Sequence, residues 1–191
     1  MRYRVCFALC LAVEILIAQQ ADRDKSRFIE LHRADSDVLS VIRGGATAFP
    51  SAVQQSIVGE YLGVEYEVLQ GSGKPPQQEV RRIGLEALRE YIGHVGAVDE
   101  REIPSLRSIF LDKLGKGALT FPGQKRYGMI VVESSPPPEE VLVNSEHFAG
   151  TVGKLCVLPG SYTVTVKRPK LAACTIHVHL SSADVKTVSC K

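Results

Sequence analysis

The sequence contains no tryptophan, and aromatic residues make up only 6% of its 191 residues. It also lacks a charge excess of either sign, because the formal net charge is +2 and no segment gathers lysine and arginine. Nucleic-acid-binding surfaces need clustered cations, and those for single strands add aromatic rings on which bases stack. We therefore expect no nucleic-acid partner.

Motifs of common enzymes are absent too. The sequence has neither the G-x-S-x-G of serine hydrolases nor the H-E-x-x-H of zinc peptidases. Residues 71–74, Gly-Ser-Gly-Lys, resemble part of a phosphate-binding loop. However, Val68 stands where the first glycine is needed, and Pro75 where a serine or threonine is needed. We therefore expect no cofactor, no metal site and no enzymatic activity.

A long apolar run occurs only at the N-terminus. Two arginines precede the apolar residues 5–18, and Ala18 and Ala21 are small residues at which cleavage is possible. This pattern is typical of a secretory signal peptide, whereas a membrane-spanning helix needs about 20 apolar residues. Because Glu14 interrupts the run, an uncleaved anchor and a buried first helix remain alternatives. We predict a signal peptide at residues 1–21 and a secreted or periplasmic protein with no integral membrane span after cleavage.

Residues 22–118 are predicted to form a small helical bundle. Apolar residues recur at steps of three and four, as on the buried stripe of a helix, and glycines and prolines separate the periodic stretches. The acidic residues Asp99, Glu100 and Glu102 are interpreted as the charged start of the last helix. The expected helices cover residues 26–43 with a possible break at 34–37, then 50–69, 76–91 with Gly93 and Gly96 as its end, and 104–114.

From residue 129 onward the apolar period changes to two, which indicates strands. Five or six short strands are expected in residues 129–191, with residues 119–128 as a linker. The predicted fold class is α+β, a small N-terminal helical bundle followed by a C-terminal antiparallel β-sandwich. The clearest alternation places Tyr162, Val164 and Val166 on a dry face and Thr163, Thr165 and Lys167 on a wet face.

Residues 135–151 and 155–171 resemble the PEGA domain, a small β-sandwich module of exported and envelope proteins of bacteria and archaea. The family pattern has a Ser-x-Pro corner, a Val-x-Val-Asp-Gly strand end, a Gly-x-Thr-Pro step and a Leu-x-Pro-Gly-x-Tyr-x-Val-x-Val block. The residues that match it are Ser135 and Pro137, then Val141, Val143 and Asn144, then Gly150 and Thr151, and finally Leu158, Pro159, Gly160, Tyr162, Val164 and Val166.

The match to the PEGA pattern has gaps. Glu139 and Glu140 stand where Gly-Ala is usual, Ser145 replaces a turn glycine, and Val152 replaces a proline. These departures concern the turn type of the first hairpin more than the overall fold. The resemblance covers residues 129–191 and implies a non-catalytic module that contacts envelope components or acts as a spacer.

Three cysteines would remain in the mature protein: Cys156, Cys174 and Cys190. An oxidising compartment allows one disulfide among them. Cys174 and Cys190 flank a predicted hairpin near Ser182, whereas Cys156 and Cys174 lie on strands that are possible neighbours. Both pairings remain open, as does a third possibility in which all three stay reduced or pair otherwise.

His177 and His179 project from the same face of a predicted strand. With a nearby thiolate they could ligate zinc, which accepts nitrogen and sulfur ligands. No C-x-x-C or H-x-x-x-H spacing accompanies them, so we interpret them as surface histidines.

The sequence thus favours an exported, non-catalytic binding or spacer protein whose partner is a cell-envelope component or another envelope protein. The alternative is an enzyme with its active site in the helical half and the sandwich as an accessory domain. Self-association through the helical region is a further possibility. The ionisable residues that such an active site could gather are Glu65, Glu67, His94 and Asp99.

Overall fold

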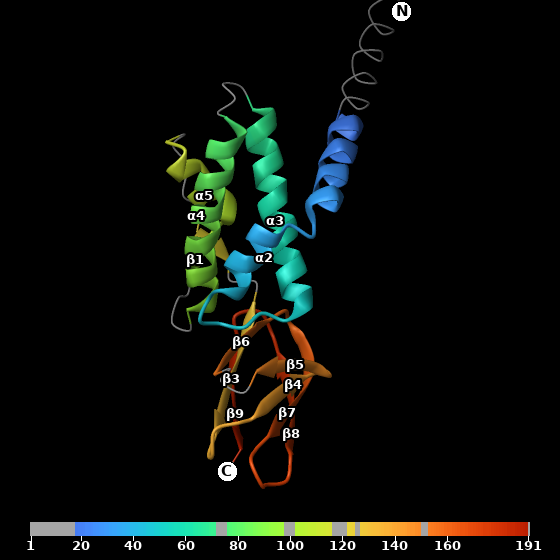
Figure 1. The fold of residues 1–191 in the computed structure, drawn as a ribbon, viewed down its shortest axis with the longest axis vertical. Coiled ribbons are helices and arrows are strands. Elements are labelled where there is room, and N and C mark those ends of the chain that lie inside the picture. Colours follow the sequence, from blue (N-terminus) through green and yellow to red (C-terminus); the bar gives the residue numbers. More distant parts are fainter. Residues whose placement is uncertain are drawn as a thin grey trace, which may run out of the picture.

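A computed structural model describes residues 18–71, 76–97, 102–115, 122–124, 127–149 and 153–190. Helices occupy one end of the molecule and β-sheets the other, with the C-terminus at the far end of the sheets (Figure 1). The predicted α+β fold class is therefore confirmed.

The first predicted helix is divided into two. The chain is helical over residues 18–32, and α2 (Ser36–Arg43) follows after a short break within the stretch predicted to be weak. Asp35 causes this restart, because its side chain accepts hydrogen bonds from the backbone N–H groups of Asp37 and Val38. Such a cap satisfies donors that have no partner within the helix.

The next two helices, α3 (Ser51–Gln70) and α4 (Gln77–Gly96), begin within one residue of the predicted positions. Helix α4 runs five residues past the predicted end at Tyr91 and passes through Gly93. The expectation that Gly93 stops the helix is therefore wrong. The buried side chains Ile92 and Val95 lie on this extension, and their packing outweighs the cost of about 1 kcal/mol for a glycine in a helix.

The start of the last helix also differs from expectation. Helix α5 (Leu106–Lys113) is capped by Ser105, whose hydroxyl accepts from the N–H of Ser108. Glu102 does not lie in its first turn but in β1 (Glu102–Pro104), and Asp99 and Glu100 lie outside the described residues. An uncharged hydroxyl therefore takes the capping role that we assigned to carboxylates.

The predicted linker, residues 119–128, also contains ordered structure. Strand β2 (Pro122–Gln124) pairs antiparallel with β1, and Tyr127 is buried. Strand β3 begins at Gly128, one residue before the predicted start of the sandwich. The described residues of the predicted linker, 122–124 and 127–128, are therefore part of the fold.

Seven strands form two packed sheets. One sheet has the order β6-β3-β9 and the other β5-β4-β7-β8. The pair β3 and β9 is parallel, which departs from the predicted antiparallel arrangement. The chain leaves the four-stranded sheet after β8 and enters the other sheet with β9, so β9 does not pair with its predecessor. The strands are β3 (Gly128–Ser134), β4 (Glu140–Val143), β5 (Glu146–Ala149), β6 (Lys154–Val157), β7 (Gly160–Lys167), β8 (Cys174–Leu180) and β9 (Val185–Cys190).

Local details of the sandwich follow the sequence closely. On β7, Val164 and Val166 are fully buried and Tyr162 packs partly against the same core, as predicted. Asn144 and Ser145 form the two-residue turn between β4 and β5, both with positive φ. This is the hairpin turn that matches the twist of the strands, so a glycine is not needed to make it.

Cys174 and Cys190 form a disulfide, the first of the pairings that the sequence left open. Their strands, β8 and β9, belong to different sheets, so the bond joins the two layers instead of crossing one hairpin ladder. Cys156 is a buried thiol outside this bond.

The helical part and the sandwich share strands of the three-stranded sheet. On β3 and β6, Ile130 and Leu155 face the interior of the sandwich, while Met129 and Cys156 pack with buried residues of the helices. Two successive residues on a strand point to opposite faces. The sheet is therefore covered on both sides at this end, and the two halves of the molecule share buried contacts.

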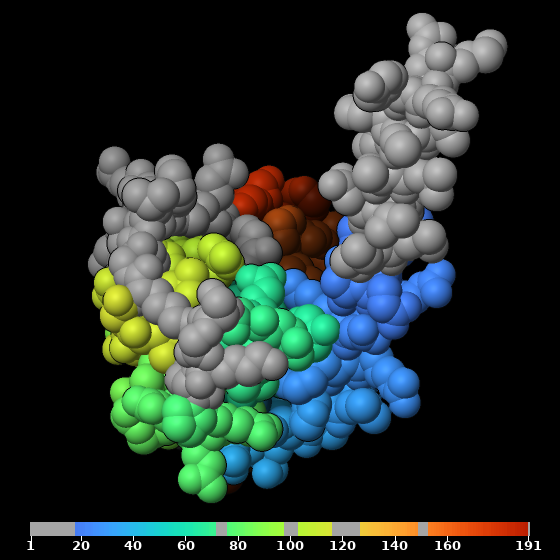
Figure 2. All heavy atoms as spheres, turned by 90° about the horizontal axis from the view of Figure 1, so that it is seen from above, coloured from blue at the N-terminus to red at the C-terminus, as the bar shows by residue number. Residues whose placement is uncertain are grey.

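The N-terminal helix, residues 18–32, lies at the edge of the helical part beside α3 (Figure 2). Lys25 pairs with Glu67 at 2.7 Å, and the ring of Phe28 lies 5.4 Å from that of Tyr66. No helix among the described residues is long and apolar enough to cross a membrane. Most of the predicted signal peptide lies outside the described residues, and self-association stays a prediction.

Candidate binding pocket

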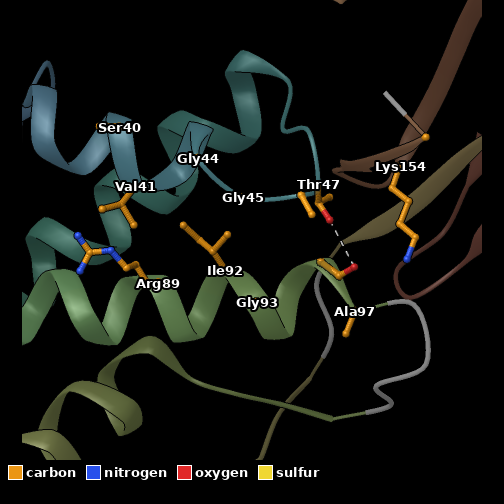
Figure 3. Close-up of a pocket in the computed structure, with 13 residues that line it drawn as sticks. Ser40, Val41, Gly44, Gly45, Thr47, Arg89, Ile92, Gly93, Ala97 and Lys154 are labelled. Carbon is orange, nitrogen blue, oxygen red and sulfur yellow. Dashed lines mark hydrogen bonds between the residues drawn. The ribbon is translucent and has the colours of Figure 1, made fainter. Parts of the chain in front are cut away.

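A pocket of about 630 Å³ lies where the helical part meets the sheets. Its walls are the end of α2, the loop after it, the last turns of α4 and the start of β6 (Figure 3). The volume lies in the range of small-molecule sites, which is roughly 300–1,000 Å³.

The upper wall is the C-terminal end of α2 and the loop that leaves it. Gly44 caps α2 by donating its N–H to the carbonyl of Ser40. A Cβ on Gly45 would lie 3.3 Å from Cγ2 of Ile92, which is closer than most such contacts. The small residue thus lets the loop approach α4, and Ile92 becomes the apolar floor of the pocket.

Thr47 holds the loop against the end of α4. Its hydroxyl faces the carbonyl oxygen of Gly96 at 3.5 Å (Figure 3). A Cβ on Gly96 would lie only 2.5 Å from that hydroxyl oxygen. Glycine is therefore required at position 96 for this close approach, whereas the sequence suggested only that it ends the helix.

The same loop joins the edge of the three-stranded sheet. Ala48 donates its N–H to the carbonyl of Lys154 and accepts from the N–H of Cys156, and it pairs with Leu155. Two residues further on, the chain reaches Pro50, the cap of α3, which provides no side-chain hydrogen bond. Glu146 of β5 takes that role by accepting from the N–H and hydroxyl of Ser51.

The pocket is electropositive at both ends. Arg89 of α4 and Lys154 of β6 are exposed and, among the described residues, neither has an ion pair. The carboxylates of α4 nearest to Arg89 in sequence are engaged elsewhere, since Glu86 pairs with Arg82 and Glu90 with Lys113. An anionic group entering the pocket would therefore meet two available cations.

Three of the candidate active-site residues of the helical half, Glu65, Glu67 and His94, are described by the structure, and none of them lines this pocket. Glu65 is buried beside Arg81, 3.4 Å away, and Arg81 also contacts Asp35. Burial raises the pKa of the Glu65 carboxyl, although the charge of Arg81 opposes the shift. Burial also raises the pKa of Tyr61, which lies over the same arginine. These groups hold helices together in a core.

The remaining candidates are also apart from one another. Glu67 binds Lys25 and Arg107, and these two partners outweigh its burial and lower its pKa. His94 lies 3.9 Å from Glu90, and Asp99 lies outside the described residues. The described members of the proposed set therefore do not converge on one site.

His177 and His179 are exposed on the outer face of β8, as the sequence suggested. A thiolate partner for zinc is not at hand, because Cys174 is in the disulfide and Cys156 is buried in the helical core. Among the described residues, no group of three histidines, cysteines or carboxylates is placed to hold a metal ion.

The sequence analysis missed the pocket because its residues come from three separate segments of the chain. The available signal was the two glycine clusters, at 44–45 and at 93 and 96, which we interpreted as helix ends. Glycines also allow two backbones to approach each other closely, here the loop after α2 and helix α4. No family model and no curated protein sequence matches this chain, so the kinship with the PEGA domain stays a prediction from residues 135–171.

Proposed function

We propose that this protein is an exported, non-catalytic binding protein of the cell envelope, and that its ligand occupies the pocket between helices and sheets. The predicted export signal and the PEGA-like pattern of the sequence support the proposed location. The pocket supports binding, and the ligand class we propose is a carboxylate-bearing component of the cell wall. Scaffolding within the envelope, the spacer role, is compatible with this activity.

The observation that carries the proposal is the chemistry of the pocket lining. Among the described residues of that lining, Arg89 and Lys154 are the ionisable side chains, and the rest are hydroxyls, glycines and apolar groups. Acid–base or nucleophilic catalysis needs an imidazole, carboxylate or thiol near the reacting group. A pair of cations flanking an apolar floor instead favours binding of an acidic molecule over the alternative of an enzyme.

Gly93 provides a direct test. A Cβ built there meets nothing within 4 Å, and the residue lines the pocket. Gly93→Leu should therefore fill the pocket without disturbing the fold. Gly59→Leu is the matched control, since Gly59 is also inside a long helix with nothing within 4 Å but lies outside the pocket.

The probe is a set of soluble muropeptides from purified cell wall, titrated into the whole chain by calorimetry. Wild type and Gly59→Leu should bind, Gly93→Leu should not, and Arg89→Gln should bind about tenfold more weakly. Muropeptides with amidated carboxylates should bind to the wild-type protein about as weakly as unmodified muropeptides bind to Arg89→Gln. Equal binding by the two glycine variants, or no binding by wild type, would contradict the proposal.

Export is tested separately. Residues 1–21 fused to alkaline phosphatase should yield activity, because this enzyme needs disulfides that form outside the cytosol. Absence of activity, with activity from a known signal as control, would contradict the localisation while leaving the pocket assignment intact.

A further inference from the structure

We propose that His177 and His179 form a two-histidine site for a late divalent transition metal such as Zn²⁺, with Ser161 and Thr163 of the neighbouring strand holding the two rings. This site lies on the outer face of the four-stranded sheet, and it is independent of the pocket described above.

The two imidazoles are held in the same way by the same strand. In the β7–β8 ladder, Ser161 is opposite His179 and Thr163 is opposite His177. The hydroxyl of Ser161 lies 3.0 Å from Nδ1 of His179, and that of Thr163 lies 3.1 Å from Nδ1 of His177. Both rings are therefore fixed by matching contacts on one face of the sheet.

These contacts leave Nε2 of each ring available to a metal ion. When Nδ1 carries the proton it donates to the hydroxyl, and the lone pair of Nε2 is available. Among the described residues, Nε2 of neither ring has a hydrogen-bond partner. Histidine ligands usually donate their other ring N–H to a partner in this way, which fixes both tautomer and orientation.

The spacing of the two residues suits chelation. Residues i and i+2 of a strand share a face with Cα atoms about 6.5–7 Å apart, a span that two imidazoles can close around one ion. A hollow of about 230 Å³ lies beside them, lined also by Tyr162 and Val178. It leaves room for water or another ligand to complete a tetrahedral set.

Two other histidines of this chain show a different environment. His147 contacts the carboxylate of Glu140, which also binds Lys167 at 2.5 Å, and His94 lies near Glu90. No carboxylate of the described residues lies within ion-pair distance of His177 or His179. Imidazole nitrogens are ligands that suit zinc, copper and nickel.

The test titrates untagged protein with Zn²⁺ by calorimetry and follows the histidine ring signals by NMR. One ion should bind per chain, and the ring signals of His177 and His179 should shift before those of the other three histidines. H177Q or H179Q should weaken binding about 100-fold, because loss of either ring removes the intramolecular second bond. H147Q is the control and should leave affinity unchanged.

The supporting strand gives a second measurement. S161A and T163V should each weaken Zn²⁺ binding about tenfold, as expected when a partner that orients a ligand is removed. Wild-type protein that binds no Zn²⁺ at millimolar concentration would overturn the proposal. So would binding of equal strength in the H177Q/H179Q double variant, which would place the ion elsewhere.

Discussion

The helical half and the sandwich are stabilised by different means. Among the described residues, the buried polar or charged side chains, Thr47, Glu65 and Ser108, all belong to the helical half and its loops, whereas the core of the sandwich is apolar. The sandwich instead has a covalent bond between its two sheets. The stability of one half therefore depends on protonation, and that of the other on oxidation.

Shared strands limit the independence of the two halves. Met129 and Cys156 are strand residues that lie in the helical core, and Glu146 of the sheet caps α3. We therefore expect a substitution that destabilises either half to lower the stability of both.

The largest expected loss of stability comes from the buried ion cluster of Asp35, Glu65 and Arg81. Arg81→Met should destabilise the protein by about 3–5 kcal/mol near pH 7, because it leaves the buried carboxylate of Glu65 without its partner. Arg82→Met is the control, since Arg82 is an exposed neighbour paired with Glu86, and it should cost less than about 0.5 kcal/mol. Urea unfolding of both variants measures the difference.

The loss in the Arg81 variant should depend on pH. Because the pKa of Glu65 is raised, the folded state favours its protonated form. Its contribution to the free energy of unfolding is therefore present at low pH and is lost as the pH rises through the pKa that it has in the folded state. Asp35 has a lowered pKa: its burial is outweighed by the N–H of Val38 and by Arg81, and its contribution is lost on acidification. Both effects make the destabilisation smaller at about pH 4 than at pH 7. An equal loss at both pH values would contradict the role of the cluster.

The disulfide comes next in magnitude. Replacing Cys174 and Cys190 together by serine opens a loop with a sequence separation of 16 residues and should cost about 3 kcal/mol. Because the halves share buried contacts, the unfolding transition should move to lower temperature by the same amount whether it is followed by helix circular dichroism or by tyrosine absorbance. Helices that melt at the wild-type temperature in this variant would show that the two halves are independent.

Two glycines of the helical half differ in how tightly their surroundings are packed. A Cβ on Gly84 would lie 2.7 Å from Cζ of Phe110 and 2.8 Å from the hydroxyl of Tyr61, whereas Gly59 has nothing within 4 Å. Gly84→Ala should destabilise by about 2 kcal/mol through overpacking. Gly59→Ala should stabilise by about 1 kcal/mol through helix propensity. Thermal denaturation of both variants should therefore give shifts of opposite sign.

The smallest effect concerns the joint between the halves. Glu146→Gln keeps the shape of the side chain but removes the negative charge at the N-terminus of α3. We expect a loss of about 0.5 kcal/mol, which salt should reduce in the wild type. A much larger loss in urea unfolding would mean that the cap is essential for docking the two halves.

Several features of the candidate sites were predictable from local pattern. The pairing of Cys174 with Cys190 was one of two favoured pairings, and His177 and His179 were placed on one exposed strand face because strand residues alternate. The hydroxyl partners of the histidines were not predicted, since they depend on the register between β7 and β8. Nor was the pairing of Glu65 with Arg81 across α3 and α4, because the periodicity of each helix says nothing about its neighbour.

By itself, the sequence determined that helices precede strands, the wet and dry faces of β7, and the stretch around Asp35 in which a helix break was possible. All of these depend on interactions within a few residues, which the periods of 3.6 and two record directly. Only the tertiary structure decided that β3 and β9 are parallel, that Met129 and Cys156 complete a helical core, and that Ser40, Ile92 and Lys154 surround one pocket. The reason is that these contacts join segments far apart in the chain, and their positions follow from how whole faces pack rather than from any local pattern.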